Sequence, residues 1–139
     1  MTLSIHLQMV GALLMVLGLS HVFFSRYFGW RQELAGVTLL TRRVFFVHTF
    51  FIGLGVTMNG AVSLFCARTL LVPSALSSAV LAGMAVFWFC RLLAQFFAYD
   101  AVLWRGDRFR TFMHVAFSAL WCYVTATYGL ALISVWSRR

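Results

Sequence analysis

Four long apolar segments dominate this chain and leave little room for a soluble fold. They run over residues 3–24, 44–67, 75–99 and 112–136. A helix needs about 20 mainly apolar residues to cross the hydrocarbon core of a bilayer. Only 10% of the residues are charged, whereas a soluble domain carries about 25%. The sequence therefore predicts an all-α integral membrane protein: a four-helix bundle, up-down-up-down, with residues 1–139 as one membrane domain.

The first apolar segment could also be read as a secretory signal peptide. No basic residue precedes it, and its apolar run is long for the hydrophobic region of such a peptide. We therefore expect it to be a span. The third segment follows Pro73 and Ser74, which is a typical start of a helix.

The arginines are distributed unevenly among the connections and predict an orientation. Connections 25–43 and 100–111 carry seven of them, whereas residues 68–74 and the C-terminus carry three. Cytoplasmic loops are enriched in Lys and Arg. We therefore expect both arginine-rich connections in the cytoplasm and both termini outside it. All eleven basic residues are Arg, which favours a GC-rich bacterial genome and hence a bacterial inner membrane.

The formal net charge of +8 does not indicate a nucleic acid partner. Nucleic acid binding places basic residues together on one face or stripe. Here they are spread thinly between apolar runs and suit anchoring to anionic lipid at the membrane surface. The expected partners are the lipid bilayer and other membrane-protein subunits.

The connection between the first two spans is long, and its residues 30–40 mix apolar and polar side chains. Such a pattern is typical of a helix that lies in the membrane interface. We predict a short interfacial helix there, between spans one and two.

A few polar residues inside the spans are the best candidates for function, because such residues are costly in lipid. With alternating helix directions, five of them fall in the cytoplasmic half of the bilayer: His21, His48, His114, Arg91 and Gln95. Helical periodicity adds a polar interior network of three more: Asn59, Ser118 and Thr125. We expect the stripes that contain these residues, such as His48, Gly55 and Asn59, to face the bundle interior.

Three interpretations of this cluster remain open. It could be a hydrogen-bond network that fixes helix packing, with no cofactor. His48 and His114 could instead ligate haem b axially, or the histidines could bind a transition metal. Finally, Arg91 and Gln95 could hold a carboxylate, a phosphate or a quinone carbonyl.

Catalysis has little support in the sequence, and no catalytic residue is predicted. The chain has no G-x-S-x-G motif. Its three acidic residues all lie in or beside the arginine-rich connections.

Two local patterns resemble a known family. Residues 43–49 read Arg-Val-Phe-Phe-Val-His-Thr, and residues 91–100 run from Arg91 through Gln95 to Tyr99 and Asp100. Their placement in a four-span chain resembles the eukaryotic ergosterol-biosynthesis scaffold family, with His48, Arg91 and Gln95 where that family tends to have Trp, His and Glu. The resemblance implies a small membrane protein that tethers enzymes and is not itself a catalyst. The chain is also generally similar to uncharacterised four-span bacterial membrane proteins.

Together these features predict a non-catalytic accessory or scaffold subunit of a larger membrane complex. The alternative is a redox or ligand-binding membrane protein that uses the histidine, arginine and glutamine cluster.

Overall fold

The computed structural model describes residues 2–139, and within that range it contains helices and no strand. The long helices are α1 (Leu3–Tyr27), α3 (Leu39–Phe65), α5 (Ala75–Phe97) and α6 (Arg108–Trp136). Each is long and apolar enough to cross a membrane. Four short elements connect them: α2 (Trp30–Glu33), the 3-10 helix η1 (Leu34–Gly36), α4 (Ala67–Leu70) and the 3-10 helix η2 (Ala101–Leu103). The predicted all-α class with four apolar helices is confirmed.

Capping side chains set where three of the long helices begin. The oxygens of Thr38, Ser74 and Asp107 accept hydrogen bonds from the backbone N–H groups of Thr41, Ser77 and Arg110, over 3.2, 3.0 and 3.0 Å. Such caps satisfy N–H groups that have no partner within the helix. As a result α3 and α6 begin about one turn before the predicted spans, whereas α5 begins at Ala75 as predicted.

The predicted short helix between the first two spans is present as α2 followed by η1. Gly29 precedes it in the left-handed conformation, with φ of 64°, which glycine adopts without steric cost. The segment is shorter than predicted: it ends at Gly36, because Val37 is extended and Thr38 caps the next helix.

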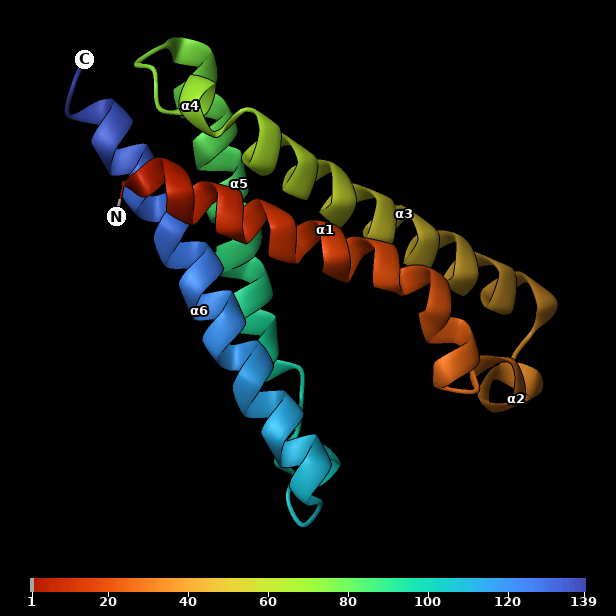
Figure 1. Cartoon of the computed structure of the whole chain (residues 1–139). Coiled ribbons are helices and arrows are strands. Elements are labelled where there is room, and N and C mark those ends of the chain that lie inside the picture. Colours follow the sequence, from red (N-terminus) through yellow and green to blue (C-terminus); the bar gives the residue numbers. More distant parts are fainter. Residues whose placement is uncertain (1) are drawn as a thin grey trace. The chain divides into compact units, whose positions relative to one another are not determined.

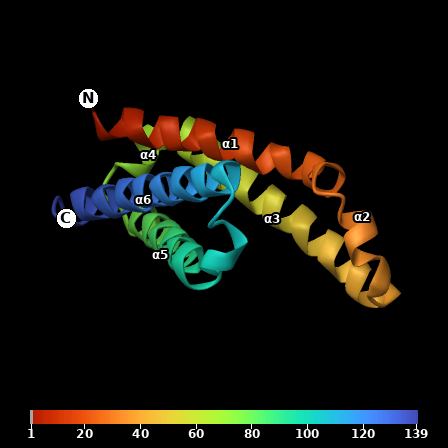
Figure 2. The ribbon, with the colours of Figure 1, turned by 90° about the horizontal axis from the view of Figure 1, so that it is seen from below.

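The chain forms two compact units, each described by itself. Residues 8–67 form the N-terminal unit, and residues 2–7 with 68–139 form the C-terminal unit. Figures 1 and 2 show α1 beside α3 in the former and α5 beside α6 in the latter. That residues 1–139 make one membrane domain stays a prediction.

Glycines bring α1 and α3 into backbone contact in the N-terminal unit. A Cβ atom placed on Gly60 would lie 2.7 Å from the backbone nitrogen of Met15 and 2.8 Å from the carbonyl oxygen of Gly11. A Cβ on Gly18 would collide with Thr57 and lie 2.8 Å from the carbonyl oxygen of Gly53. The pairs follow opposite chain directions, so the two helices are antiparallel. Small residues allow this close approach between membrane helices.

A seam of buried side chains joins α5 to α6 in the C-terminal unit. The buried residues recur three, four or seven positions apart, as expected for the packed face of a helix. On α5 the seam includes Ser77, Leu81, Met84, Trp88 and Gln95. On α6 it includes Trp121, Val124, Tyr128, Ala131 and Val135.

The first turn of α1 belongs to the same unit and is tied to α6. The Nδ1 atom of His6 and the hydroxyl of Tyr123 are 2.9 Å apart.

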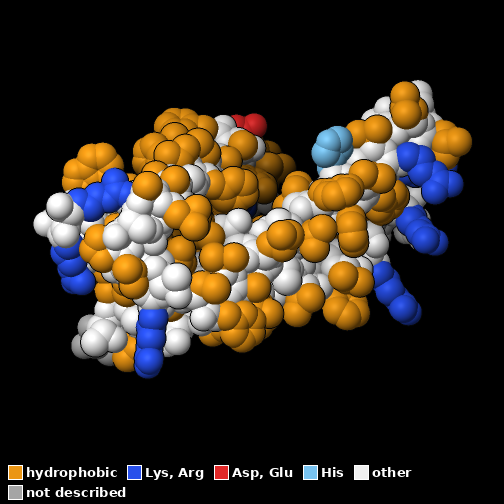
Figure 3. All heavy atoms as spheres, turned by 90° about the horizontal axis from the view of Figure 1, so that it is seen from above, with side chains coloured by type: hydrophobic (Ala, Val, Ile, Leu, Met, Phe, Trp, Pro, Cys, Tyr) orange, Lys and Arg blue, Asp and Glu red, His pale blue; other side chains and the backbone are white. Residues whose placement is uncertain are grey.

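On the face shown in Figure 3, hydrophobic side chains cover most of the surface between arginines at the helix ends. This distribution suits helices surrounded by lipid.

Candidate functional site

Three of the predicted site residues meet at the α5–α6 seam. Nη1 of Arg91 lies 3.3 Å from Oε1 of Gln95, one turn further along α5. The amide nitrogen of Gln95 lies 3.0 Å from Nδ1 of His114 on α6. Gln95 is 4% exposed, so these bonds form away from the surface, where they are strongest.

Aromatic rings enclose this polar group. The indole N–H of Trp121 donates to Oε1 of Gln95 over 3.2 Å. The guanidinium of Arg91 lies over the Trp121 ring, 4.7 Å from its centre. Trp121 also stacks with Trp88, with ring centres 5.2 Å apart. A cation over an indole is favourable, and more so where water is excluded.

The bonding pattern fixes the orientation of the Gln95 amide. Arg91 and the indole of Trp121 can only donate hydrogen bonds, so the atom that both approach must be the oxygen. The NH₂ group of Gln95 therefore faces His114 and donates to its Nδ1. It follows that Nδ1 of His114 carries no proton and that the neutral ring bears its proton on Nε2.

This tautomer does not suit a metal or haem ligand at His114. A histidine that ligates through Nε2 donates its Nδ1 proton to an acceptor. Here Nδ1 is the acceptor, and its partner is a donor. The imidazole also stacks on Trp104, with ring centres 4.4 Å apart and planes 8° apart, which holds the ring in place.

The other two histidines of the predicted cluster lie in the N-terminal unit. His21 Nδ1 is 2.8 Å from the carbonyl oxygen of Leu17, and His48 Nδ1 is 3.0 Å from that of Val44. Each Nδ1 must donate to its carbonyl, which leaves Nε2 as a potential ligand atom. His21 is half-buried beside Gly53, and His48 is exposed. Within residues 2–139 no three His, Cys, Asp or Glu side chains come together as a metal site.

The predicted interior residues bond within their own helices or not at all. The amide nitrogen of Asn59 is 3.3 Å from the carbonyl oxygen of Gly55, and Ser118 donates to the carbonyl of His114 over 2.7 Å. The amide oxygen of Asn59 and the hydroxyl of Thr125 are buried without a hydrogen-bond partner among the described residues.

The expected stripe on α3 is not the face that packs against α1. The buried residues of α3 are Gly53, Val56, Gly60 and Ser63. His48 and Gly55 of the predicted stripe are exposed. The reason is that close backbone approach, permitted by glycine, selects the contact face rather than polarity.

Arg91 forms no salt bridge with a carboxylate among the described residues. Among residues 2–139 the ion pair within 4.0 Å is Arg110 with Asp107. Instead the Arg91 guanidinium lies near two aromatic rings, 4.7 Å from the centre of the Trp121 ring and 5.8 Å from that of Tyr99. Tyr99 and Trp104 were not predicted as site residues, because ring contacts near a loop leave no periodic signal in the sequence.

Two buried indole groups near this network lack a hydrogen-bond acceptor. They are the Nε1 atoms of Trp88 and Trp104, within the described part of the chain. Trp88 is 1% exposed. Buried indole N–H groups usually have a partner, so the seam has more donors than acceptors.

A second group of polar residues, predicted only as membrane anchors, lies where α2 meets the start of α3. Arg31, Arg42 and Arg43 line one cavity there with Leu39 and Phe46. The sequence signal for this group was the high density of arginine in connection 25–43.

Comparison of the chain with protein-family models, curated proteins and solved structures found no match.

Proposed function

We propose that this chain is a non-catalytic accessory subunit of a larger membrane complex. The observation that carries the proposal is the bonding of Gln95, whose oxygen accepts from Arg91 and Trp121 while its nitrogen donates to His114. The polar side chains best placed to hold a cofactor thus satisfy one another. Their role in this proposal is to lock α5 against α6.

The exposed stripe on α3 supports a partner helix. His48 and Gly55 are exposed, and the buried amide oxygen of Asn59 lacks a partner among residues 2–139. Polar groups in a span gain most from hydrogen bonds to another helix, and glycine permits its close approach. A helix of another subunit packed on this stripe would supply the hydrogen-bonding groups that lipid lacks.

A photo-crosslinking experiment tests this proposal in the native membrane. A photoreactive amino acid at Gly55 should give one stoichiometric adduct with another membrane protein. The matched control is Leu54, which is also exposed and at similar depth but points to a different side of α3. The double variant His48→Leu/Asn59→Leu should lose the complex in mild detergent. A chain that runs alone and monomeric under every gentle condition would contradict the proposal.

A second candidate function is binding of a lipophilic ligand with an acceptor group, such as a quinone carbonyl, carboxylate or phosphate. The unpartnered indole N–H groups of Trp88 and Trp104 favour it. A short-chain quinone should then quench tryptophan fluorescence with a saturable curve. Trp88→Phe, which keeps an aromatic ring and removes the donor, should abolish saturation while the protein remains folded.

The haem or metal alternative has a direct test. Absorption spectra and metal analysis of the purified protein should lack a Soret band and stoichiometric iron, copper or zinc. If either is present and is lost on replacing His48 with Ala, the non-catalytic proposal fails.

We also infer a bacterial inner membrane location with both termini outside the cytoplasm. The support is the distribution of arginine, seven against three, between the two sets of connections. A C-terminal alkaline phosphatase fusion should be active and a C-terminal green fluorescent protein fusion dark. The reverse result would place Arg138 and Arg139 in the cytoplasm.

A further inference from the structure

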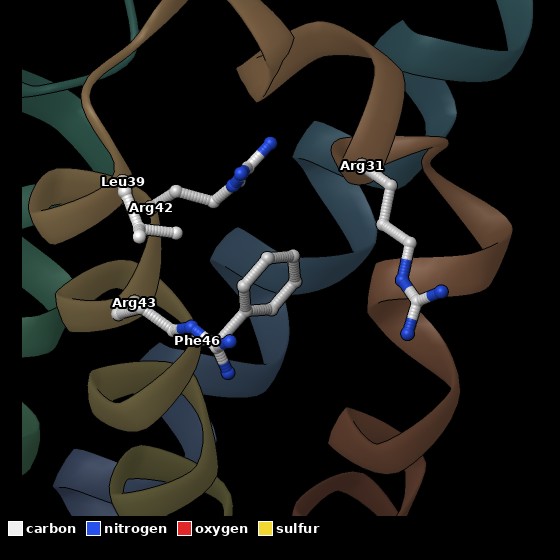
Figure 4. Close-up of a pocket in the computed structure, with 5 residues that line it drawn as sticks. All are labelled: Arg31, Leu39, Arg42, Arg43 and Phe46. Atoms are coloured by element: carbon white, nitrogen blue, oxygen red, sulfur yellow. The ribbon is translucent and has the colours of Figure 1, made fainter.

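A basic cavity lies at the end of the N-terminal unit where α2 meets the start of α3. Its volume is about 300 Å³, and it is lined by Arg31, Leu39, Arg42, Arg43 and Phe46. Arg31 comes from α2 and the others from the first turns of α3, with the Phe46 ring between the arginines (Figure 4).

The three guanidinium groups of this cavity have no negative partner. Among residues 2–139 no carboxylate lies within 4.0 Å of Arg31, Arg42 or Arg43. Glu33 is the one acidic residue in the N-terminal unit. Like charges gathered on one cavity repel one another, and an anion bound between them relieves that repulsion.

The start of α3 adds to this attraction for an anion. The N-terminal end of a helix carries partial positive charge from unpaired N–H groups. In this turn the side chain of Thr38 accepts a hydrogen bond from only one backbone N–H group, that of Thr41. Leu39, the first residue of α3, itself lines the cavity.

We propose that this cavity binds the phosphate group of an anionic phospholipid. Guanidinium groups match phosphate with paired hydrogen bonds. Leu39 and Phe46 give the cavity an apolar side, and the neighbouring Leu40 is 74% exposed, which suits the glycerol and upper acyl chain. The cavity also lies at the end of a span, the level at which lipid phosphates lie.

Aromatic residues at the same end of the unit support this membrane depth. Trp30 contacts Phe45 edge to face at 4.9 Å and stacks with Phe28 at 5.7 Å. Trp is enriched at the headgroup level of membranes. Arg31 also lines an adjacent cavity of about 550 Å³ with Arg26 and Gln32, so the basic surface continues around α2.

The test is lipid retention by the full-length protein. It is reconstituted in nanodiscs of phosphatidylcholine with a minor fraction of phosphatidylglycerol, extracted into mild detergent and examined by native mass spectrometry. The test variant is Arg31→Gln/Arg42→Gln/Arg43→Gln. The control is Arg68→Gln/Arg108→Gln/Arg138→Gln, which removes the same charge from other exposed helix ends.

Retained phosphatidylglycerol is the expected result for the unmodified protein and the control. Each cavity substitution should weaken retention about fivefold, from the attraction of one arginine to anionic lipid. Equal loss of phosphatidylglycerol retention in both triple variants would overturn the proposal, because it would indicate general attraction to the charged surface. Unchanged retention in both variants would also overturn it, because the arginines would then not attract the lipid. If the triple variant does not fold, the single variants Arg31→Gln and Arg42→Gln carry the same test.

A soluble-ligand arm separates a lipid site from a free phosphate site. Inorganic phosphate and glycerol phosphate should neither displace the bound lipid nor raise the melting temperature of lipid-free protein. If either does so as well as phosphatidylglycerol, the cavity recognises a soluble anion and the lipid assignment is wrong.

Discussion

The indole of Trp121 and the amide of Gln95 join α6 to α5, because Nε1 of the former donates to Oε1 of the latter over 3.2 Å. This bond determines more than local packing. It fixes which end of the amide faces His114 and thereby the position of that ring's proton.

Gln95→Met should destabilise the hairpin of α5 and α6. The variant keeps the length of the side chain but removes its bonds to Arg91, His114 and Trp121. The free energy of unfolding should fall by about 2 kcal/mol, from three interhelical or charge-assisted bonds. Denaturation in mixed micelles measures it. Ser118→Ala is the control, and its change should stay within about 0.5 kcal/mol, because Ser118 bonds only to its own helix.

His114 should carry its ring proton on Nε2 in the folded protein. The reason is the amide donor that faces its Nδ1. Nitrogen chemical shifts of the labelled ring distinguish the two tautomers. His21 and His48, which donate from Nδ1 to backbone carbonyls, should show the opposite form. A protonated Nδ1 at His114 would refute the assignment of the Gln95 amide.

Gly60→Ala should destabilise the pair of α1 and α3. The new methyl group would lie 2.7 Å from the backbone nitrogen of Met15, so a backbone must move. The expected loss is about 1–3 kcal/mol. Gly55→Ala is the matched control on the same helix, since nothing lies within 4 Å of its added Cβ atom. It should be neutral or stabilise the protein by up to about 1 kcal/mol through helix propensity.

Arg91→Lys should lower thermal stability although it keeps the charge. Lysine lacks the planar group that lies 4.7 Å from the centre of the Trp121 ring. We expect a loss of about 1 kcal/mol in detergent. Arg105→Lys is the comparison, because Arg105 lies over Trp104 at 5.5 Å but is exposed. An equal effect of the two substitutions would mean that the Arg91 contact is no stronger than a surface one.

The sequence determined the elements of this protein. Long apolar runs without charges specify four helices, because unpaired backbone groups are too costly in lipid for any open alternative. Ser74 marks the start of α5, and the arginine-rich connections mark the ends of spans. Thr38 and Asp107 are equally good caps, but apolar content alone placed those helix starts about a turn too late.

The tertiary structure decided which faces meet and which polar groups find each other. Periodicity places Arg91, Gln95 and Trp121 on stripes, yet it cannot say that Gln95 accepts from both others. It also favoured His48 and Gly55 as the buried face of α3, whereas Gly53 and Gly60 pack against α1. The physical reason is that a helix face is a property of one segment. A contact depends on the shape and hydrogen-bonding groups of two segments. Which of these groups meet is determined only when the two backbones come close together.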